Sequence, residues 1–198
     1  MKFTYAEGAT PLTNDEIFNL IPKHLSLQKE LDEWEYINIL QAEQWAFRKP
    51  YKGLLTVPFI QKLHKKMFDK TWKWAGQFRK HQTNVGIEWA LIPIELQKLA
   101  DDVAFQLKNK SLPIREIAVR LHHRLVFIHP FPNGNGGLSR LMADLFLESL
   151  NEPRFLWGRE PLVSDSITRK KYISVLKEAD KGNFINLINF AEGSSDEK

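Results

Sequence analysis

The sequence predicts an all-α fold that one short β-hairpin interrupts. Apolar side chains recur every three or four residues through most of the 198 residues, and residues typical of helix starts precede several of these runs. Only the stretch of about residues 79–93 has no helical period. With 43% hydrophobic residues, the chain can bury a full core. We therefore expect a single domain over residues 1–193, in which a helical N-terminal extension (about 12–48) precedes a core (about 54–192), and a frayed tail over residues 194–198.

Two helices are predicted before residue 50. Thr13 and Glu16 form the capping-box pattern, which opens a short helix that must end before Pro22. A longer helix is predicted over residues 27–48, because apolar and amide side chains repeat at helical spacing along one face. That face is expected to consist of Leu27, Leu31, Trp34, Asn38, Gln41 and Trp45.

The next two helices follow clear start signals. Thr56, Val57 and Pro58 are typical of a helix entry, and apolar residues then recur every four positions, at Phe59, Leu63 and Met67. Another helix is predicted to begin around Pro113. It carries one apolar stripe to its last turn, made of Ile114, Ile117, Leu121, Leu125 and Ile128. The stripe places His129 at the end of this helix.

Three helices are expected after His129. The first is expected to be the most buried, since its apolar positions recur at helical spacing, at Leu138, Leu141, Met142, Leu145, Phe146 and Leu150. Ser164 or Asp165 can cap a second helix that runs to Asp180. Asn183 can cap a last helix that ends at Gly193.

The β-hairpin is predicted within residues 80–90. This stretch is rich in Thr, Val, Ile and Trp, which suit short strands, and Asn84 to Gly86 suit the turn between them.

The segment of residues 129–140 carries the strongest indication of chemistry. Three of the ten glycines, Gly134, Gly136 and Gly137, fall within four positions, and an amphipathic helix follows. Glycines let backbone N–H groups approach an anion, and a helix N-terminus adds unpaired donors and a partial positive charge. His129 would stand beside this cradle as a proton acceptor. The pattern indicates a site for a phosphate group, such as that of a nucleotide.

The same twelve residues resemble the motif of the Fic family, which reads His-x-Phe-x-Asp/Glu-Gly-Asn-Gly-Arg-x-x-Arg. The positions that match in register are His129, Phe131, Gly134, Asn135, Gly136 and Arg140. Residues 74–79, 125–128 and 141–145 also resemble a bacterial Fic subgroup, the proteins called mobile mystery protein B. The resemblance covers most of residues 10–192.

The resemblance implies an all-α Fic fold and a protein adenylyltransferase, which transfers AMP from ATP to a hydroxyl side chain of a target protein. His129 would take the proton of an incoming Ser, Thr or Tyr hydroxyl as this attacks the α-phosphate. Phe131 would anchor the loop in the core, and Arg140 would grip a terminal phosphate. The loop's N–H groups and the Asn135 amide would form an anion hole. The nucleotide-binding residues are therefore expected to be Gly134, Asn135, Gly136, Gly137 and Arg140.

Two positions depart from the motif. Asn133 stands where the family has an acid that helps to hold Mg²⁺ (or Mn²⁺), so that Asn133 would be a weaker, uncharged metal ligand. Gly137 stands where the family has its first arginine. Weakened AMP transfer is one reading. Transfer of another group, such as phosphate, a different nucleotide or phosphocholine, and a catalytically weak binding protein are the alternatives.

The resemblance also implies a flap and a brake. The hairpin residues Thr83, Asn84, Val85, Gly86 and Ile87 would align a target segment by strand addition. Many Fic proteins carry an inhibitory glutamate, in a Ser/Thr-x-x-x-Glu-Gly/Asn pattern, that pairs with the last arginine of the motif. Ser26 and Glu30 match its first part, although Leu31 follows. Without an internal glutamate, a small antitoxin-like partner would supply the brake.

Composition disfavours other kinds of protein. The absence of cysteine rules out disulfides and favours a reducing, cytoplasmic compartment, and no apolar run is long enough for a membrane span.

The net charge of +4 says little about partners, and the basic clusters lack interleaved aromatic residues, so nucleic-acid binding is not expected. His122 and His129 are seven residues apart, which is too far for both to bind one metal ion without further ligands. The target protein and the oligomeric state stay open.

Overall fold

The computed structural model describes residues 10–48, 53–158 and 167–193. The helices in these ranges are α1 (Asn14–Phe18), α2 (Gln28–Phe47), α3 (Val57–Phe68), the short 3-10 helix η1 (Trp89–Leu91), α4 (Ile92–Asn109), α5 (Ile114–Ile128), α6 (Asn135–Ser149), α7 (Ile167–Ala179) and α8 (Ile185–Glu192). The same ranges contain no β-strand, only an isolated antiparallel bridge between Leu20 and Trp72. The predicted all-α class is confirmed. Within the described part, no helix is both long and apolar enough to cross a membrane.

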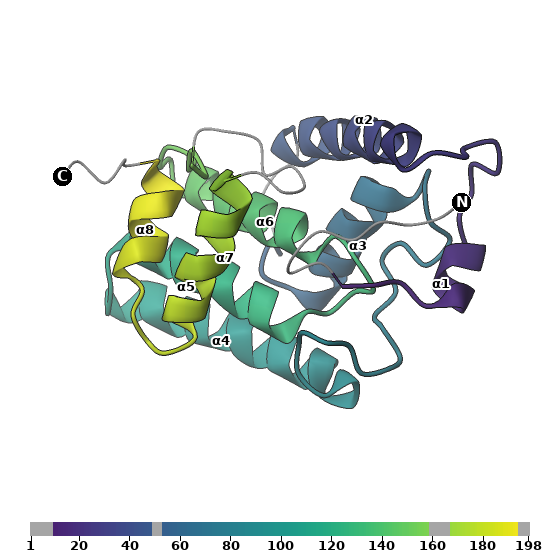
Figure 1. Cartoon of the computed structure of the whole chain (residues 1–198). Coiled ribbons are helices and arrows are strands. Elements are labelled where there is room, and N and C mark those ends of the chain that lie inside the picture. Colours follow the sequence, from purple (N-terminus) through teal and green to yellow (C-terminus); the bar gives the residue numbers. More distant parts are fainter. Residues whose placement is uncertain (1–9, 49–52, 159–166, 194–198) are drawn as a thin grey trace.

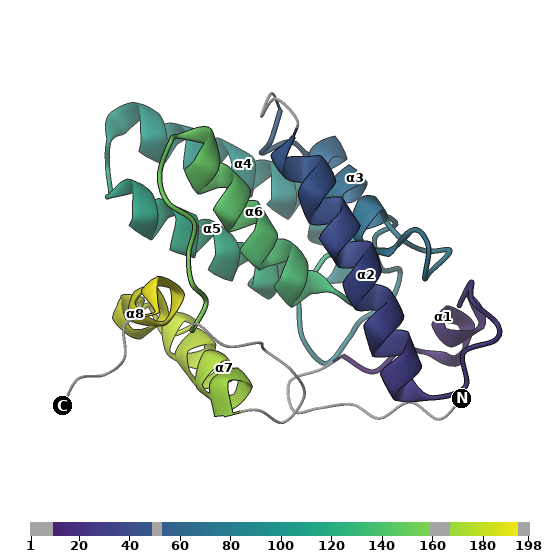
Figure 2. The same ribbon diagram turned by 90° about the horizontal axis from the view of Figure 1, so that it is seen from above.

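Helices α5 and α6 lie at the centre of one hydrophobic core (Figures 1 and 2). They pack extensively on each other, while α4 packs on α5 and α2 lies along α3. Helices α7 and α8 form a separate pair that α8 joins to α5. α6 buries nine of its 15 residues, more than any other helix in the described ranges, as its apolar pattern predicts. The loop between α5 and α6 therefore starts and ends on the most rigidly packed elements.

The predicted starts of the first three helices are confirmed. Thr13 and Glu16 form the capping box of α1: the Glu16 N–H donates to the Thr13 hydroxyl (3.3 Å), and the Thr13 N–H donates to the Glu16 carboxylate (2.7 Å). Helix α2 spans the predicted range to within one residue at each end. The Thr56 side chain accepts from the Phe59 N–H and caps α3.

The predicted inner face of α2 is only partly correct: Leu31 and Asn38 are buried and Trp45 packs against the core, but the other predicted positions are not buried. Its buried residues are Leu31, Asn38, Ala42 and Ala46. Leu27 and Gln41 are exposed, and Trp34 is 36% exposed. The two alanines face the core because small side chains let α2 approach its neighbours closely. Apolar residues also lie on the outer side of α2, at Tyr36, Ile37 and Leu40, so that periodicity alone did not identify the inner face.

The predicted β-hairpin does not form strands. Residues 80–88 are an irregular loop that leads through η1 into α4. Side chains bind the carbonyl groups that a ladder would have used: Arg79 donates to the carbonyl oxygens of His81 (2.9 Å) and Ile87, and the Gln82 amide donates to that of Gly86 (3.3 Å). Because these bonds are made within the loop, no cross-strand pairing is needed to satisfy its backbone.

The two C-terminal helices end largely as predicted. Asn183 accepts from the Ile185 N–H (3.3 Å) at the start of α8, and Gly193 ends α8 with φ 67°. α7 reaches Ala179, next to the predicted end at Asp180. The proposed caps Ser164 and Asp165, and the predicted tail over residues 194–198, lie outside the described residues.

Candidate active site

His129 stands where the backbone leaves α5. It is the C-cap of the helix and adopts a left-handed conformation (φ 53°), which is costly for a residue other than glycine. The buried guanidinium of Arg79 holds it there: Nε donates to the carbonyl oxygen of His129 (2.7 Å) and Nη2 to that of Ile128 (3.3 Å). Arg79 therefore fixes the direction in which the His129 ring points.

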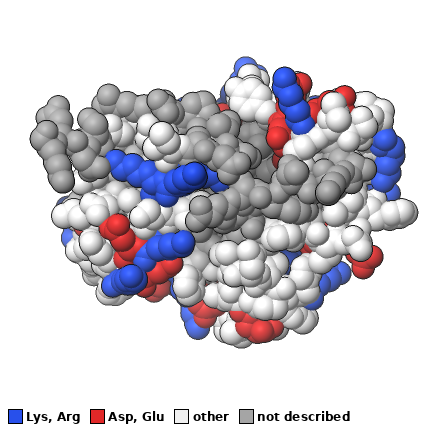
Figure 3. All heavy atoms as spheres, viewed as in Figure 1, with Lys and Arg blue, Asp and Glu red and all other residues white. Residues whose placement is uncertain are grey.

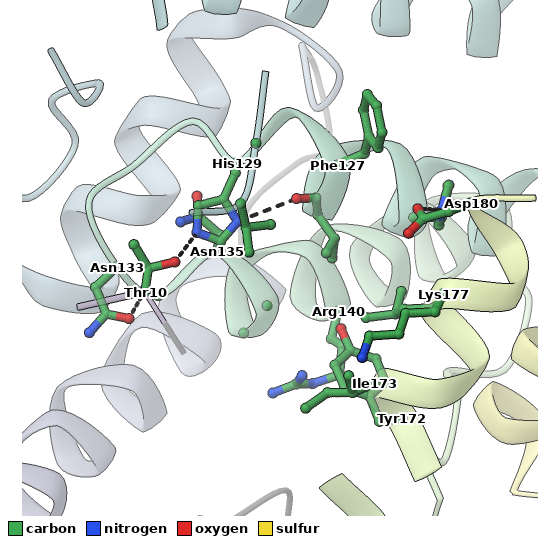
Figure 4. A pocket seen from close by; sticks show the side chains of 18 of the residues that line it. Thr10, Phe127, His129, Asn133, Asn135, Arg140, Tyr172, Ile173, Lys177 and Asp180 are labelled. Carbon is green, nitrogen blue, oxygen red and sulfur yellow. Dashed lines mark hydrogen bonds and ion pairs between the residues drawn. The ribbon is translucent and has the colours of Figure 1, made fainter. Parts of the chain in front are cut away.

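The ring of His129 presents Nε2 to the cavity. Nδ1 lies 3.4 Å from the carbonyl oxygen of Val126, which can only accept, so we assign the ring proton to Nδ1 and a lone pair to Nε2. The hydroxyl of Thr10 then donates to Nε2 (2.9 Å), and Figure 4 shows the two side chains facing each other. Burial lowers the pKa of His129 to about 4, and the nearby Arg79 cation acts in the same direction. At neutral pH, His129 is an uncharged base.

Phe131 is fully buried and fixes the loop in the core. Its ring stacks on the ring of His64, with centroids 3.7 Å apart. The Gly76 N–H donates to Nδ1 of His64 (2.9 Å), which leaves Nε2–H to donate to the carbonyl oxygen of Asn133 (3.0 Å). Burial lowers the pKa of His64 to about 3, so this ring stays neutral and keeps both bonds at working pH.

Asn135 has a different role from the expected one. Its side-chain oxygen accepts from the Phe131 N–H (2.9 Å), and its amide nitrogen donates to the Phe131 carbonyl oxygen (2.8 Å). The side chain is 2% exposed. Both polar atoms thus tie the loop to itself, so the anion hole that sequence reasoning assigned partly to the Asn135 amide must rely on backbone groups instead.

The start of α6 provides those groups. Gly134 is its N-cap, with φ 77°, and a Cβ there would lie 2.4 Å from the Phe68 ring, so that only glycine fits. No side chain in the described part caps α6. The N–H groups of its first turn, Asn135, Gly136 and Gly137, therefore have no partner within the helix, and all three residues line the cavity.

The cavity has a volume of about 460 Å³ and runs from His129 to α7. Beside His129 it is lined by Thr10, Gly86 and the 133–137 loop. Farther away it has an apolar wall of Val126, Phe127, Ile173 and Leu176. Its charged side chains are Arg140, Arg169, Lys177 and Asp180. Figure 4 shows Arg140, Tyr172, Ile173 and Lys177 together on the α7 side. Cations and free N–H groups next to an apolar wall suit an organic phosphate.

On the face shown in Figure 3, Lys and Arg side chains lie in separate groups, several of them beside Asp or Glu, and form no continuous basic surface among the residues drawn in colour.

Arg140 approaches the cavity from the second turn of α6. Its guanidinium carbon lies 5.5 Å from the centre of the Tyr172 ring, and the Tyr172 hydroxyl shares a hydrogen bond with Nε2 of His122 (2.9 Å). Burial raises the pKa of Tyr172, while the Arg140 cation opposes that shift. The Arg140 side chain also forms a hydrogen bond with Tyr172, so its remaining guanidinium donors are the ones that can bind an anion in the cavity.

Glu30 does not face Arg140. Its carboxylate accepts from the N–H groups of Ser26 (2.8 Å) and Leu27 (3.0 Å) and caps its own helix, which lowers its pKa. The proposed brake residues Ser26 and Glu30 are thus engaged with each other at the start of α2. The carboxylate of α2 within electrostatic reach of Arg140 is that of Glu43: burial raises its pKa, and Arg154 and Arg140 oppose the shift.

Asn133 offers little to a metal ion. Its side-chain oxygen already accepts from the Gly134 N–H (2.7 Å), and its backbone oxygen is bound to His64. The described residues contain no group of three or more His, Cys, Asp or Glu side chains that could hold a metal. One neutral oxygen does not make a Mg²⁺ site, so the protein's own residues fit this ion poorly.

Of the five expected flap residues, two line the cavity and three do not. Val85 and Gly86 line the cavity, and a Cβ on Gly86 would lie 2.7 Å from that of His129. The Thr83 hydroxyl donates to the Val85 carbonyl oxygen, and the Ile87 carbonyl oxygen accepts from Arg79. Asn84 is exposed. One guanidinium, that of Arg79, therefore holds both the flap loop and the His129 backbone.

Several residues at the site were not predicted from the sequence. His64 carried a signal, since it lies at helical spacing from Ile60 and Met67 on the buried face of α3. Thr10 and Arg79 carried none, because they reach His129 from 119 and 50 residues away in the sequence. Tyr172 belongs to a helix whose register toward the cavity is set only by packing.

The central part of the chain is similar to known proteins. Residues 54–147, slightly less than half of the chain, match the sequence profile described as Fic/DOC family. A protein named Protein adenylyltransferase Fic from Drosophila willistoni is 30% identical over 120 residues, which cover 59% of this chain. The aligned part spans only 22% of that relative's length.

Solved structures share the fold over most of the chain. A structure of BepC from Bartonella tribocorum, with bound AMPPNP, has a TM-score of 0.68 and 20% identity and covers 94% of this chain and 92% of its own. The N-terminal Fic domain of a cell filamentation protein from Bartonella quintana, with bound ADP, has a TM-score of 0.65 and 18% identity, covering 85% and 86%. At these identities, the likeness shows the fold.

Proposed function

We propose, on the premise that residues 54–147 form a Fic/DOC family domain, that this protein transfers AMP from ATP to a hydroxyl side chain of a target protein. The observation that carries the proposal is the hydroxyl already bound to Nε2 of His129, beside the free N–H groups of α6. Relatives named adenylyltransferases and similar folds with bound nucleotides support it. A closer relation to mobile mystery protein B stays a prediction.

His129 acts as general base in this reaction. The target hydroxyl would replace that of Thr10 at Nε2, 2.9 Å away, and transfer its proton there as its oxygen attacks the α-phosphorus. The bond from the α-phosphorus to the β-phosphate oxygen breaks, and pyrophosphate leaves. The Arg79 clamp keeps the ring direction fixed, which supplies the orientation that such a transfer needs.

The loop and α6 hold the phosphates. The N–H groups of Asn135, Gly136 and Gly137 would bind the charge that develops on the phosphate oxygens, and Arg140 would bind the terminal phosphate. The apolar wall of Val126, Phe127 and Ile173 would take the base. Mg²⁺ bound to ATP would neutralise phosphate charge, but the protein contributes at most Asn133 to its shell. With Asn133 and Gly137 both uncharged, we expect slow transfer.

Regulation is part of the proposal. We infer that Glu43, on α2, competes with the terminal phosphate for Arg140, because the two charges interact, whereas Glu30 is occupied as a helix cap. A small antitoxin-like protein is the alternative source of a brake.

The test uses ATP labelled at the α- or γ-position, with Mg²⁺ or Mn²⁺ and a bacterial lysate as the source of targets. AMP transfer predicts protein-bound label from the α-position only, and its loss in His129→Ala. Label from the γ-position would indicate phosphate transfer instead. Absence of label from both positions, in a folded protein that binds ATP, would overturn the proposal and favour a binding protein.

A further inference from the structure

We propose that Thr10 is a modification site: the protein transfers the nucleotidyl group to its own Thr10 hydroxyl. This inference rests on the proposed function and adds an acceptor within the same chain. It arises from a segment outside the matched family domain of residues 54–147.

The contact between Thr10 and His129 has the geometry of a nucleophile and its base. The hydroxyl oxygen lies 2.9 Å from Nε2, the ring nitrogen that carries the lone pair. Thr10 is only 5% exposed and lines the same cavity as Asn133, Gly134 and Arg140 (Figure 4). Its hydroxyl thus faces the place where the phosphates would lie.

The chain that follows Thr10 is anchored, so this contact is a defined position. Pro11 restricts Thr10 to an extended backbone, and Leu12 is buried in the core. The carbonyl oxygen of Glu16 in α1 accepts from the Trp74 indole N–H (3.3 Å). The Ile21 N–H donates to the Thr71 carbonyl oxygen (2.8 Å), which fixes the segment after α1. Together these contacts hold the acceptor on the body that carries His129.

The transfer to Thr10 needs ATP as its only other reactant. The Thr10 oxygen attacks the α-phosphorus, its proton passes to Nε2 of His129, and pyrophosphate leaves with the electrons of the broken bond. The product is a phosphodiester between the Thr10 oxygen and AMP. No oxidation or reduction takes place.

Modification has a consequence for the site. Unmodified Thr10 occupies the atom of His129 that a target hydroxyl needs, so it competes with transfer to other proteins. A Thr10→Val variant keeps the shape of the side chain but has no hydroxyl, and it should transfer label to other proteins faster than the wild type.

The experiment incubates the full chain with α-labelled ATP and Mg²⁺ and maps the label by peptide mass spectrometry. We expect one AMP on the peptide that contains Thr10, retained in Thr10→Ser and reduced by roughly 10²-fold or more in His129→Ala. Thr10→Val should lose this label. Ser111→Ala, which removes an exposed hydroxyl before α5, should keep it. Thermal melting of each variant checks the fold.

A mixing experiment tests that the acceptor and the base belong to one chain. His129→Ala carries an acceptor but no base, and Thr10→Val carries a base but no acceptor. Together they should leave Thr10 unlabelled.

The outcomes separate this inference from the proposed function. Label on lysate proteins but not on Thr10 of the wild type would overturn the inference and leave the function standing. Label on Thr10 of His129→Ala in the mixture would overturn transfer within one chain. Absence of label from every protein would overturn both.

Discussion

The protonation state of His129 decides over which pH range the site can work. Because burial lowers its pKa to about 4, the neutral form that accepts a proton predominates above about pH 5. We expect the rate of AMP transfer to show no ionisation of His129 between about pH 5.5 and 8, and to fall about tenfold per pH unit below pH 4. Initial rates with α-labelled ATP over this range measure it. A rate that rises through pH 6 to 7 in the wild type, but not in its slow His129→Ala variant, would show that His129 titrates as an exposed histidine.

A single substitution at Gly137 should restore what the loop lacks. A Cβ there would have Met67 Cε at 3.6 Å, an ordinary contact, and no positive φ requires glycine. An arginine in the first turn of α6 would add a charged donor to the phosphates, and loss of one such donor at other sites costs on the order of 10² in rate. We therefore expect Gly137→Arg to raise the rate of transfer by up to roughly 10²-fold.

Stability is the control for that variant. Replacing a helical glycine should raise the free energy of unfolding by roughly 0.5 to 1 kcal/mol. Urea denaturation measures this change, and ATP titration measures affinity. A variant that is folded but neither faster nor tighter in binding ATP would mean that Gly137 does not face the phosphates.

Residues that act within one loop could be predicted from the sequence, whereas residues that reach the site from distant parts of the chain could not. The spacing of His129, Phe131 and Gly134 predicted their positions because one loop holds all three. Asn135 was placed in the anion hole because nothing in the sequence shows that its amide closes a ring of bonds with Phe131. Thr10 and Arg79 reach the loop through the tertiary fold, and their own neighbourhoods give no indication of it.

Helix α2 carries two glutamates with different expected roles. The charge of Glu43 lies within electrostatic reach of Arg154 and Arg140, so Glu43→Gln should weaken its competition with the terminal phosphate for Arg140 and raise transfer. We expect a gain of roughly 2- to 10-fold, because the pair is half-buried and solvent weakens it. Initial rates at ATP concentrations below saturation measure the effect.

Glu30→Gln is the matched control on the same helix. It removes the carboxylate that accepts from the N–H groups of residues 26 and 27, so it should lower the free energy of unfolding slightly without raising transfer. If Glu30→Gln were the activated variant instead, Glu43 would not be the brake and α2 would have to move for Glu30 to reach Arg140.

Element types followed from local patterns, whereas their detailed faces did not. Capping at Thr13 and Thr56 and the apolar stripe of α5 depend on residues close in sequence, and these predictions are confirmed. The inner face of α2 depends on how closely its alanines approach α3 and α6, which is a property of packing. The β-hairpin prediction was wrong for a related reason. The guanidinium of Arg79 binds carbonyl oxygens of the loop, in place of the cross-strand hydrogen bonds that β-propensity predicts.

The cavity is formed both by residues 54–147 and by segments outside this range. Residues 54–147 contribute His129, the 133–137 loop and Arg140. The opposite wall comes from α7, and the hydroxyl at Nε2 comes from the N-terminal segment. If the proposed transfer takes place, its choice of acceptor therefore depends on parts of the chain outside residues 54–147, and the motif alone does not predict the target.

Global stability should depend on pH through Glu35, where α2 docks on the body. Its carboxyl group accepts from the Trp72 indole N–H (2.5 Å), and burial raises its pKa to about 7 from an ordinary value of 4.5. Between these values the folded protein holds a proton that the unfolded chain has released, so the contribution of Glu35 to stability falls as pH rises, by at most about 1.4 kcal/mol per pH unit. His64, whose pKa burial lowers to about 3, acts in the opposite direction at acid pH.

The wild type must therefore be compared with Glu35→Gln, which keeps an acceptor for Trp72 but cannot titrate. We expect the variant to gain roughly 1 to 3 kcal/mol relative to the wild type between pH 5 and pH 8 in urea denaturation. Glu33→Gln, on an exposed side chain of the same helix, should reproduce the wild-type profile. Parallel profiles for the wild type and Glu35→Gln would show that water reaches Glu35 and that α2 docks less tightly than its contact with Trp72 implies.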